Sequence, residues 1–92
     1  MAQVSVVEAG KFAPYTVEVD EEGDVLAQLQ GLVGGHIEVV QPHGIPRIMN
    51  KVVLVVDEEG VLKDLPFNAL AADMAGQPIV GTALVLNVGV LK

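Results

Sequence analysis

The strongest hydrophobic signal in the chain is the run VVLVV at residues 52–56, in which four of the five side chains are valine. A short apolar run bounded by turn residues is typical of a strand buried within a sheet. Residues 57–60, DEEG, end the run with polar side chains and a glycine that is able to adopt a positive φ, which is typical of a chain reversal at a sheet edge. After this turn, Leu62 and Leu65 are predicted to return to the core.

Three strands are predicted ahead of that run, two of them from alternating patterns. Apolar and polar side chains alternate through residues 14–20, and this period of two indicates a strand with one solvated face. Residues 3–9 are largely apolar and β-branched, and the turn signal at Gly10 predicts that they form a hairpin with residues 14–20. Residues 36–40, HIEVV, also alternate and are predicted to form the third strand.

A first helix is predicted over residues 25–33. Its apolar positions follow the i, i+3, i+4, i+7, i+8 spacing of one helical face. Asp24 is placed to cap the helix N-terminus, and the pair Gly34 and Gly35 is expected to end it. The face predicted to point inward consists of Val25, Leu26, Leu29, Leu32 and Val33.

A second helix is predicted over residues 66–76. Pro66 suits its first position, Asn68 is available to bond local backbone groups, and Gly76 lies past its end. The face predicted to point inward consists of Phe67, Leu70, Ala71 and Met74.

The remaining segment, residues 79–90, is predicted to be a strand, with bends or bulges at Gly81 and Gly89. It has few polar side chains to face water. We therefore expect this strand to lie in the centre of the sheet or to be covered by another subunit.

Together these elements predict one α+β domain over residues 1–92. The sheet is expected to be small, mixed or antiparallel, with five to six strands and two short helices in the order ββαββαβ. A chain of 92 residues is near the lower limit for a self-sufficient core, and its aromatic content is only 3%. We expect a homo-oligomer, because association would hide the remaining apolar surface.

Composition narrows the possible functions. The net charge is −7, which opposes binding to duplex nucleic acid. The chain has no cysteine, so disulfides and thiolate metal sites are excluded. We identify neither a signal peptide nor an apolar stretch long enough to span a membrane, and we expect a cytoplasmic protein.

No group of residues has the spacing of a catalytic or metal site. The two histidines, His36 and His43, are seven residues apart and do not form an HExxH motif. The only serine, Ser5, lies in a predicted strand and outside any G-x-S-x-G turn. The glycines match neither common phosphate-binding loop. We expect a protein that is not an enzyme and that holds no metal or cofactor.

The most basic stretch is the irregular segment at residues 41–51, QPHGIPRIMNK. It contains Arg47 and Lys51, two of the five basic residues, with His43 nearby. Local positive charge in an acidic chain makes this segment a candidate contact for an anionic ligand or an acidic partner surface. The alternative, which we favour, is a solvated connection without a functional role.

Four short motifs carry a resemblance to a known family. They are GGHIE at residues 34–38, DEEG at residues 57–60, LPFN at residues 65–68 and IVG at residues 79–81. In this order they resemble domain-of-unknown-function family 3846, small proteins of phages, prophages and other bacterial mobile elements. The resemblance implies a compact α+β domain of viral or mobile-element origin, without an activity that can be carried over to particular residues. Asp64 stands where glycine is common in that family.

Three functions remain open. The first is a non-enzymatic, oligomeric binding module that contacts a host or phage protein through an exposed strand edge or the 41–51 segment. The second is an oligomeric anti-defence sponge for a small anionic nucleotide signal, in which His43, Arg47 and Lys51 balance the ligand's charge and Asn68 reads a polar edge. The third is an accessory structural protein. In each case a phage-encoded protein would work in the host cytoplasm.

Overall fold

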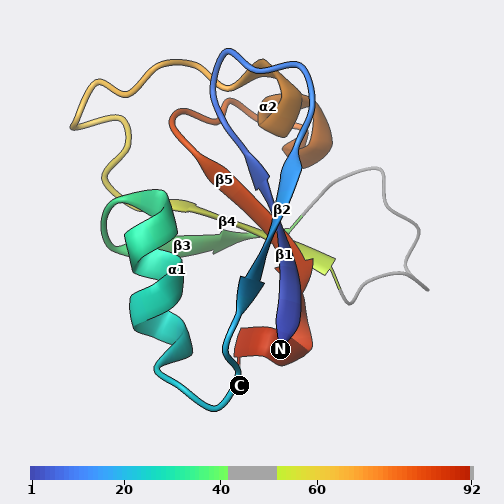
Figure 1. The fold of residues 1–92 in the computed structure, drawn as a ribbon. Coiled ribbons are helices and arrows are strands. Elements are labelled where there is room, and N and C mark those ends of the chain that lie inside the picture. The colour runs from blue at the N-terminus through green and yellow to red at the C-terminus, as the bar shows by residue number, and fades with distance from the viewer. Residues whose placement is uncertain (42–51, 92) are drawn as a thin grey trace.

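The computed structural model describes residues 1–41 and 52–91, and in these residues it contains one five-stranded antiparallel sheet. The strands lie in the order β2-β1-β5-β4-β3 (Figure 1). The predicted α+β class and the order ββαββαβ are confirmed. The elements are β1 (Ala2–Val7), β2 (Tyr15–Val19), α1 (Val25–Val33), β3 (Ile37–Val40), β4 (Val52–Asp57), α2 (Ala69–Ala75), β5 (Ala83–Asn87) and the short 3-10 helix η2 (Val88–Leu91).

The most apolar strands lie inside the sheet. β5 is the central strand, with β1 on one side and β4 on the other. Both neighbours pair with it in antiparallel register, Val6 opposite Leu84 and Leu54 opposite Val85. Of the two alternatives predicted for the last strand, the central position is the one observed, and the run at residues 52–56 is a buried strand as expected.

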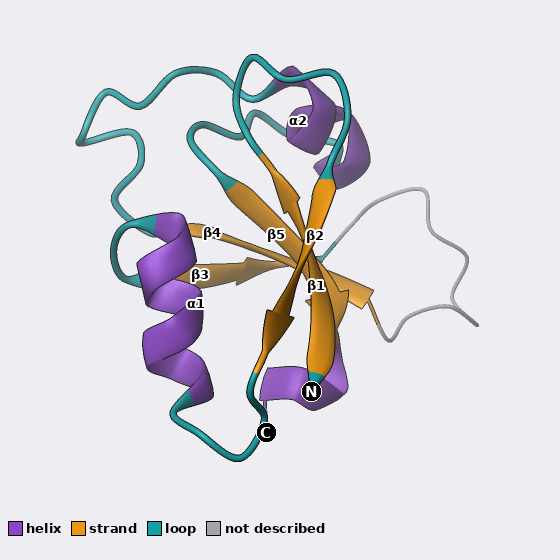
Figure 2. Cartoon of the chain, viewed as in Figure 1, coloured by secondary structure: helices purple, strands orange, loops and turns teal. Residues whose placement is uncertain are grey.

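The two faces of the sheet are covered by different helices, as Figure 2 shows. Side chains alternate along β4, so Val53 and Val55 pack on the α1 side while Leu54 and Val56 pack on the α2 side. Valine, leucine, alanine and isoleucine make up both buried clusters. The three aromatic residues, Phe12, Tyr15 and Phe67, are all exposed.

The first helix begins and ends as predicted. The Asp24 carboxylate accepts a hydrogen bond from the Ala27 backbone N–H at 3.0 Å, and Gly34 ends the helix with φ of 96°. The predicted inward face is only partly correct. Leu29 and Val33 are buried, whereas Leu26 is 54% exposed because it lies at the margin of the stripe.

The second helix begins three residues later than predicted. The Asn68 N–H donates to the Ile79 carbonyl, and the Gly81 N–H donates to the Pro66 carbonyl, so the chain from Pro66 to Asn68 runs extended beside residues 79–81. Phe67 pairs across this short ladder with Val80. The prediction that Phe67 faces the core is wrong, because its extended backbone turns the ring outward and leaves it 58% exposed.

The turn after β4 differs from the prediction in the position of Leu62. Leu62 does not return to the core but is 84% exposed, and Leu65 is half-buried. Gly60 does not have a positive φ. It is needed for space instead, because a Cβ at this position would lie 2.9 Å from a methyl carbon of Val80. The residue with the left-handed conformation is Asp64, with φ of 55°.

The last predicted strand is shorter than expected. Residues 79–82 cross from α2 to the sheet, with φ of 76° at Gly81, and β5 occupies only Ala83–Asn87. The strand ends where the Asn87 side-chain oxygen accepts a hydrogen bond from the Gly89 N–H at 2.8 Å, and the chain turns into η2.

An ion pair between a buried carboxylate and a partly exposed lysine ties the end of β4 to the following turn. The Asp57 side chain is 1% exposed, and its carboxylate accepts a hydrogen bond from the Lys63 ammonium at 2.8 Å. The same ammonium donates to the Gly34 carbonyl at 3.3 Å, which links α1 to this turn. The Lys63 hydrogen bond, helped by the Glu59 N–H, holds the pKa of Asp57 below its usual value of 3.8, although burial opposes this shift.

The pair predicts a pH dependence of stability. The pKa of Asp57 is lower in the folded state than in the unfolded state. The ionised side chain therefore adds to the free energy of unfolding in full at pH values above the unfolded-state pKa. This added stability is lost as the pH falls through the folded-state pKa. Urea unfolding from about pH 6 to about pH 2 should show this loss in the wild type. Asp57→Asn should lower the unfolding free energy near neutral pH and flatten the acid slope. Glu58→Gln, an exposed neighbour, should keep the wild-type slope. An unchanged slope in Asp57→Asn would contradict this assignment.

Candidate functional site

The outer edge of β2 is an unpaired sheet edge in the part of the chain that the structure describes. β2 pairs on one side with β1, where Val17 lies opposite Val4. It is the terminal strand of the sheet, so no strand within residues 1–41 or 52–91 pairs with its other side. A strand edge presents a row of N–H and C=O groups that can bond an added strand.

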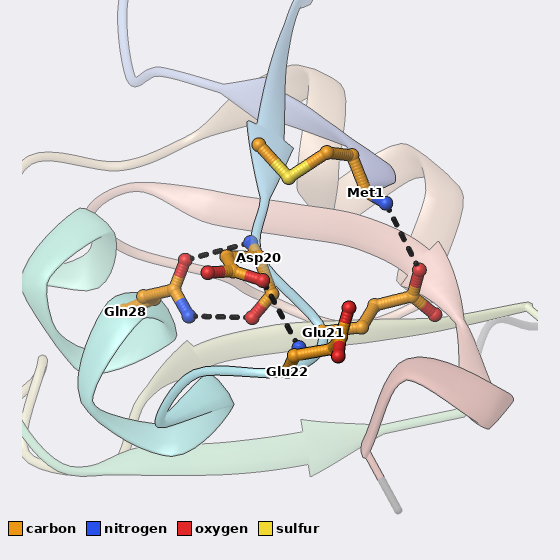
Figure 3. Close-up of polar contacts among 5 residues, drawn as sticks. All are labelled: Met1, Asp20, Glu21, Glu22 and Gln28. Carbon is orange, nitrogen blue, oxygen red and sulfur yellow. Dashed lines mark hydrogen bonds and ion pairs between the residues drawn. The ribbon is translucent and has the colours of Figure 1, made fainter.

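Gln28 closes one end of this edge. Its side-chain oxygen accepts a hydrogen bond from the Asp20 N–H at 2.8 Å, and its amide nitrogen donates to the Asp20 carbonyl at 2.9 Å (Figure 3). The same nitrogen donates to the Asp24 carbonyl at 3.2 Å. The amide of Gln28 thus bonds Asp20 as a neighbouring strand would, and it fixes the N-terminal part of α1 against the end of β2.

This contact identifies the backbone groups that face outward. The N–H and C=O of one strand residue point to the same edge, and residues two apart share that direction. Since Asp20 directs both groups toward α1, Glu18 and Thr16 direct theirs the same way. Both residues are exposed, and their outward groups make no hydrogen bond to any described residue. They are available to a partner.

A groove runs between this edge and α1. Its volume is about 270 Å³. Gly31 leaves it open, because a Cβ built on this residue would meet no atom within 4 Å. Val17 and Leu32 are half-buried and supply apolar walls. We call this site the edge groove, and it is lined by Val17, Glu18, Val19, Gln28, Gly31 and Leu32.

The edge groove is acidic. Glu18 lies on it, and the turn from β2 to α1 carries four more carboxylates, at Asp20, Glu21, Glu22 and Asp24. The N-terminal ammonium of Met1 approaches Glu21 at 3.5 Å (Figure 3). All twelve carboxylates of the chain lie in the described residues, with only two of its five lysines and arginines. A cationic partner is therefore favoured here.

The family model for a domain of unknown function, DUF3846, matches residues 1–89. The chain belongs to the DUF3846 family. No curated protein and no solved structure matches it. At position 64, where the resemblance implied glycine, this DUF3846 chain has an aspartate in the left-handed conformation, a geometry that glycine adopts most easily.

Among the described residues of this DUF3846 protein, no helix is long and apolar enough to cross a membrane. Residues 1–41 and 52–91 also contain no cluster of three or more histidine, aspartate or glutamate side chains that could hold a metal ion.

Three of the four residues predicted to bind a ligand or partner lie outside the described residues. These are His43, Arg47 and Lys51, so the basic-segment hypothesis and the nucleotide-sponge hypothesis built on it stay predictions. The fourth, Asn68, is 1% exposed. Its side-chain hydrogen bonds go to backbone groups of other described residues.

Asn68 instead connects three parts of the fold. Its amide nitrogen donates to the Val7 carbonyl at 2.9 Å and to the Gly81 carbonyl at 2.8 Å, which uses both amide hydrogens. Its oxygen accepts a hydrogen bond from the Ala71 N–H at 3.1 Å and caps α2. The sequence predicted the local backbone role but not the contacts to β1 and to the start of β5.

Sequence reasoning did not identify the edge groove. The alternation in residues 14–20 indicated a half-solvated strand, but alternation does not reveal whether a strand lies at a sheet edge. Gly31, within a predicted helix, was the available signal, because a glycine there often leaves room for another chain.

Asn68→Ala should destabilise the protein by about 2–4 kcal/mol, because it removes a helix cap and leaves two buried carbonyls unpaired. Urea unfolding measures the change in free energy. The matched control is Asn87→Ala, which removes one exposed side-chain hydrogen bond and should cost at most about 0.5 kcal/mol. Equal losses in the two variants would contradict the role assigned to Asn68.

Proposed function

We propose that this protein is a non-enzymatic binding module of a phage or mobile element that recognises a host or phage protein. In this proposal an extended, basic segment of the partner adds to the edge of β2. The observation that carries the proposal is the pair of outward-facing backbone positions, Thr16 and Glu18, beside an open acidic groove.

Strand addition would use the outward backbone groups of β2 and the apolar side chains that line the edge groove. Backbone hydrogen bonds to Thr16 and Glu18 would supply affinity that depends little on sequence. Alternate side chains of the added segment would point toward α1, where Val17 and Leu32 favour an apolar residue. The Gln28 side chain already bonds the backbone N–H and C=O of Asp20. The added segment would therefore pair only with the part of β2 that precedes Asp20.

Charge favours a basic segment over a second copy of this chain at the β2 edge. Two copies of β2 paired at this edge would bring Glu18 and Asp20 of one copy near the same acidic residues of the other. Like charges that face each other across strands are destabilising. Lysine or arginine on the added segment would instead meet these carboxylates.

The test uses two synthetic peptides, one alternating lysine with valine and one alternating glutamate with valine. Titration into the isotope-labelled protein should shift the amide resonances of Thr16 and Glu18 with the basic peptide only. Both amides should also gain protection from hydrogen exchange, because each becomes hydrogen-bonded. Shifts confined to other elements, or equal binding of the acidic peptide, would contradict the proposal.

A backbone variant makes the test sharper. Thr16→Pro removes an outward N–H without removing a bond to β1, and proline is tolerated at such edge positions. It should weaken binding of the basic peptide about five- to tenfold, the value of one backbone hydrogen bond. The matched control Thr16→Val keeps the N–H and should bind as the wild type does. If both variants bind equally, strand addition at this edge is excluded.

A further inference from the structure

A second surface gathers both phenylalanines of the chain. Phe12, in the connection between β1 and β2, and Phe67, just before α2, line the same cleft. Its volume is about 740 Å³. This region lies beside α2, where the connection after β1 passes close to that helix in Figure 1. We call it the phenylalanine cleft, and it is lined by Gly10, Lys11, Phe12, Phe67, Ala69, Leu70 and Asp73.

The exposure of its rings is unusual for this fold. Phe12 is fully exposed and Phe67 is 58% exposed, although smaller apolar side chains fill both cores. Leu70, between them on α2, is half-buried and extends the apolar surface. Large apolar side chains grouped on a surface are typical of an interface, and aromatic residues often dominate its binding energy.

The α2 wall of the cleft is bonded to the end of β1. Asn68 bonds the Val7 carbonyl at the end of β1, from which the chain leads to Phe12, and Asn68 is adjacent to Phe67. The rigid part of the cleft is therefore the α2 wall with Phe67 and Leu70, while Phe12 projects from a connection into solvent.

Charge at the cleft suits a second copy of this chain. Lys11 and Asp73 both line it, and neither forms an ion pair with any described residue. The only other lysine in the described residues, Lys63, is bonded to Asp57. The phenylalanine cleft thus combines apolar surface with one charge of each sign, whereas the rest of the described surface is dominated by carboxylates that repel another copy.

We infer that the phenylalanine cleft is the interface of a two-fold symmetric homodimer. In such an interface the same patch meets itself, so each contact occurs twice. Phe12 of each copy inserts against the second copy's Phe67 and Leu70. Lys11 of each copy meets the second copy's Asp73, which places two ion pairs at the rim of the apolar contact.

This inference is independent of the proposed strand addition, because the phenylalanine cleft and the edge groove share no residue. Peptide binding tests one surface and molecular mass tests the other. Either proposal can fail while the other stands.

Sedimentation velocity and light scattering test the interface. The wild type should have twice the monomer mass of 9.6 kDa. Phe12→Ser should be monomeric and still folded, because the ring belongs to neither core cluster; its melting temperature should no longer depend on protein concentration, as that of a dimer does. The matched control Leu62→Ser removes another large exposed side chain, away from the cleft, and should stay dimeric. A monomeric wild type, or a dimeric Phe12→Ser, would overturn the inference.

Charge exchange tests the symmetry. Lys11→Glu and Asp73→Lys should each weaken the dimer about tenfold or more, because each change places like charges together twice. The double variant carrying both changes rebuilds the pairs with reversed polarity and should recover most of the lost affinity. If the double variant is as weak as the single ones, Lys11 does not meet Asp73 and the proposed geometry is wrong.

Discussion

The structure depends on the need of β4 and β5 for apolar cover on both faces. Each lies between two other strands, and their side chains alternate between the α1 side and the α2 side. The cover comes from two helices of nine and seven residues. Small aliphatic side chains fill both layers, and each buried valine, leucine or isoleucine contributes about 1.5–3 kcal/mol. The three aromatic residues lie outside both cores.

Asn68 holds α2 over one face of the sheet and thereby positions one wall of the phenylalanine cleft. α2 is short and gains little from its own backbone bonds, so it depends on its cap and on packing through Ala71 and Ala75. One amide supplies the cap and also bonds Val7 and Gly81, which brings β1, β5 and the helix start together. The phenylalanine cleft is built from segments that flank these bonds. Asn68, which the sequence suggested as a ligand contact, is buried and shapes this surface through the backbone that it bonds.

The sequence predicted the elements well and the surfaces poorly, for physical reasons. Periodicity and capping are local, so α1, the hairpin and the buried strands followed from patterns in consecutive residues. Phe67 and Leu62 were assigned to the core because hydrophobicity does not show which way an extended segment or turn directs its side chain. Phe67 faces outward because residues 66–68 pair with residues 79–81, a contact between distant parts of the chain. The edge groove also depends on contacts between distant parts of the chain, because the strand order of the whole sheet determines that β2 is the terminal strand.

The two proposed surfaces of this very acidic small protein differ in charge, and each therefore suits a different kind of contact. An edge strand invites pairing with any other chain, and Glu18 together with the carboxylates after β2 discourages self-pairing there while still admitting a basic segment. Gln28 shortens the available edge further by bonding Asp20. In the proposed dimer, self-association uses the phenylalanine cleft, where Lys11 offsets local negative charge and apolar rings supply the attraction. Because the proposed dimer contact pairs charges of both signs, whereas the proposed partner contact uses carboxylates on a surface with no shared lining residue, the two proposed contacts do not compete.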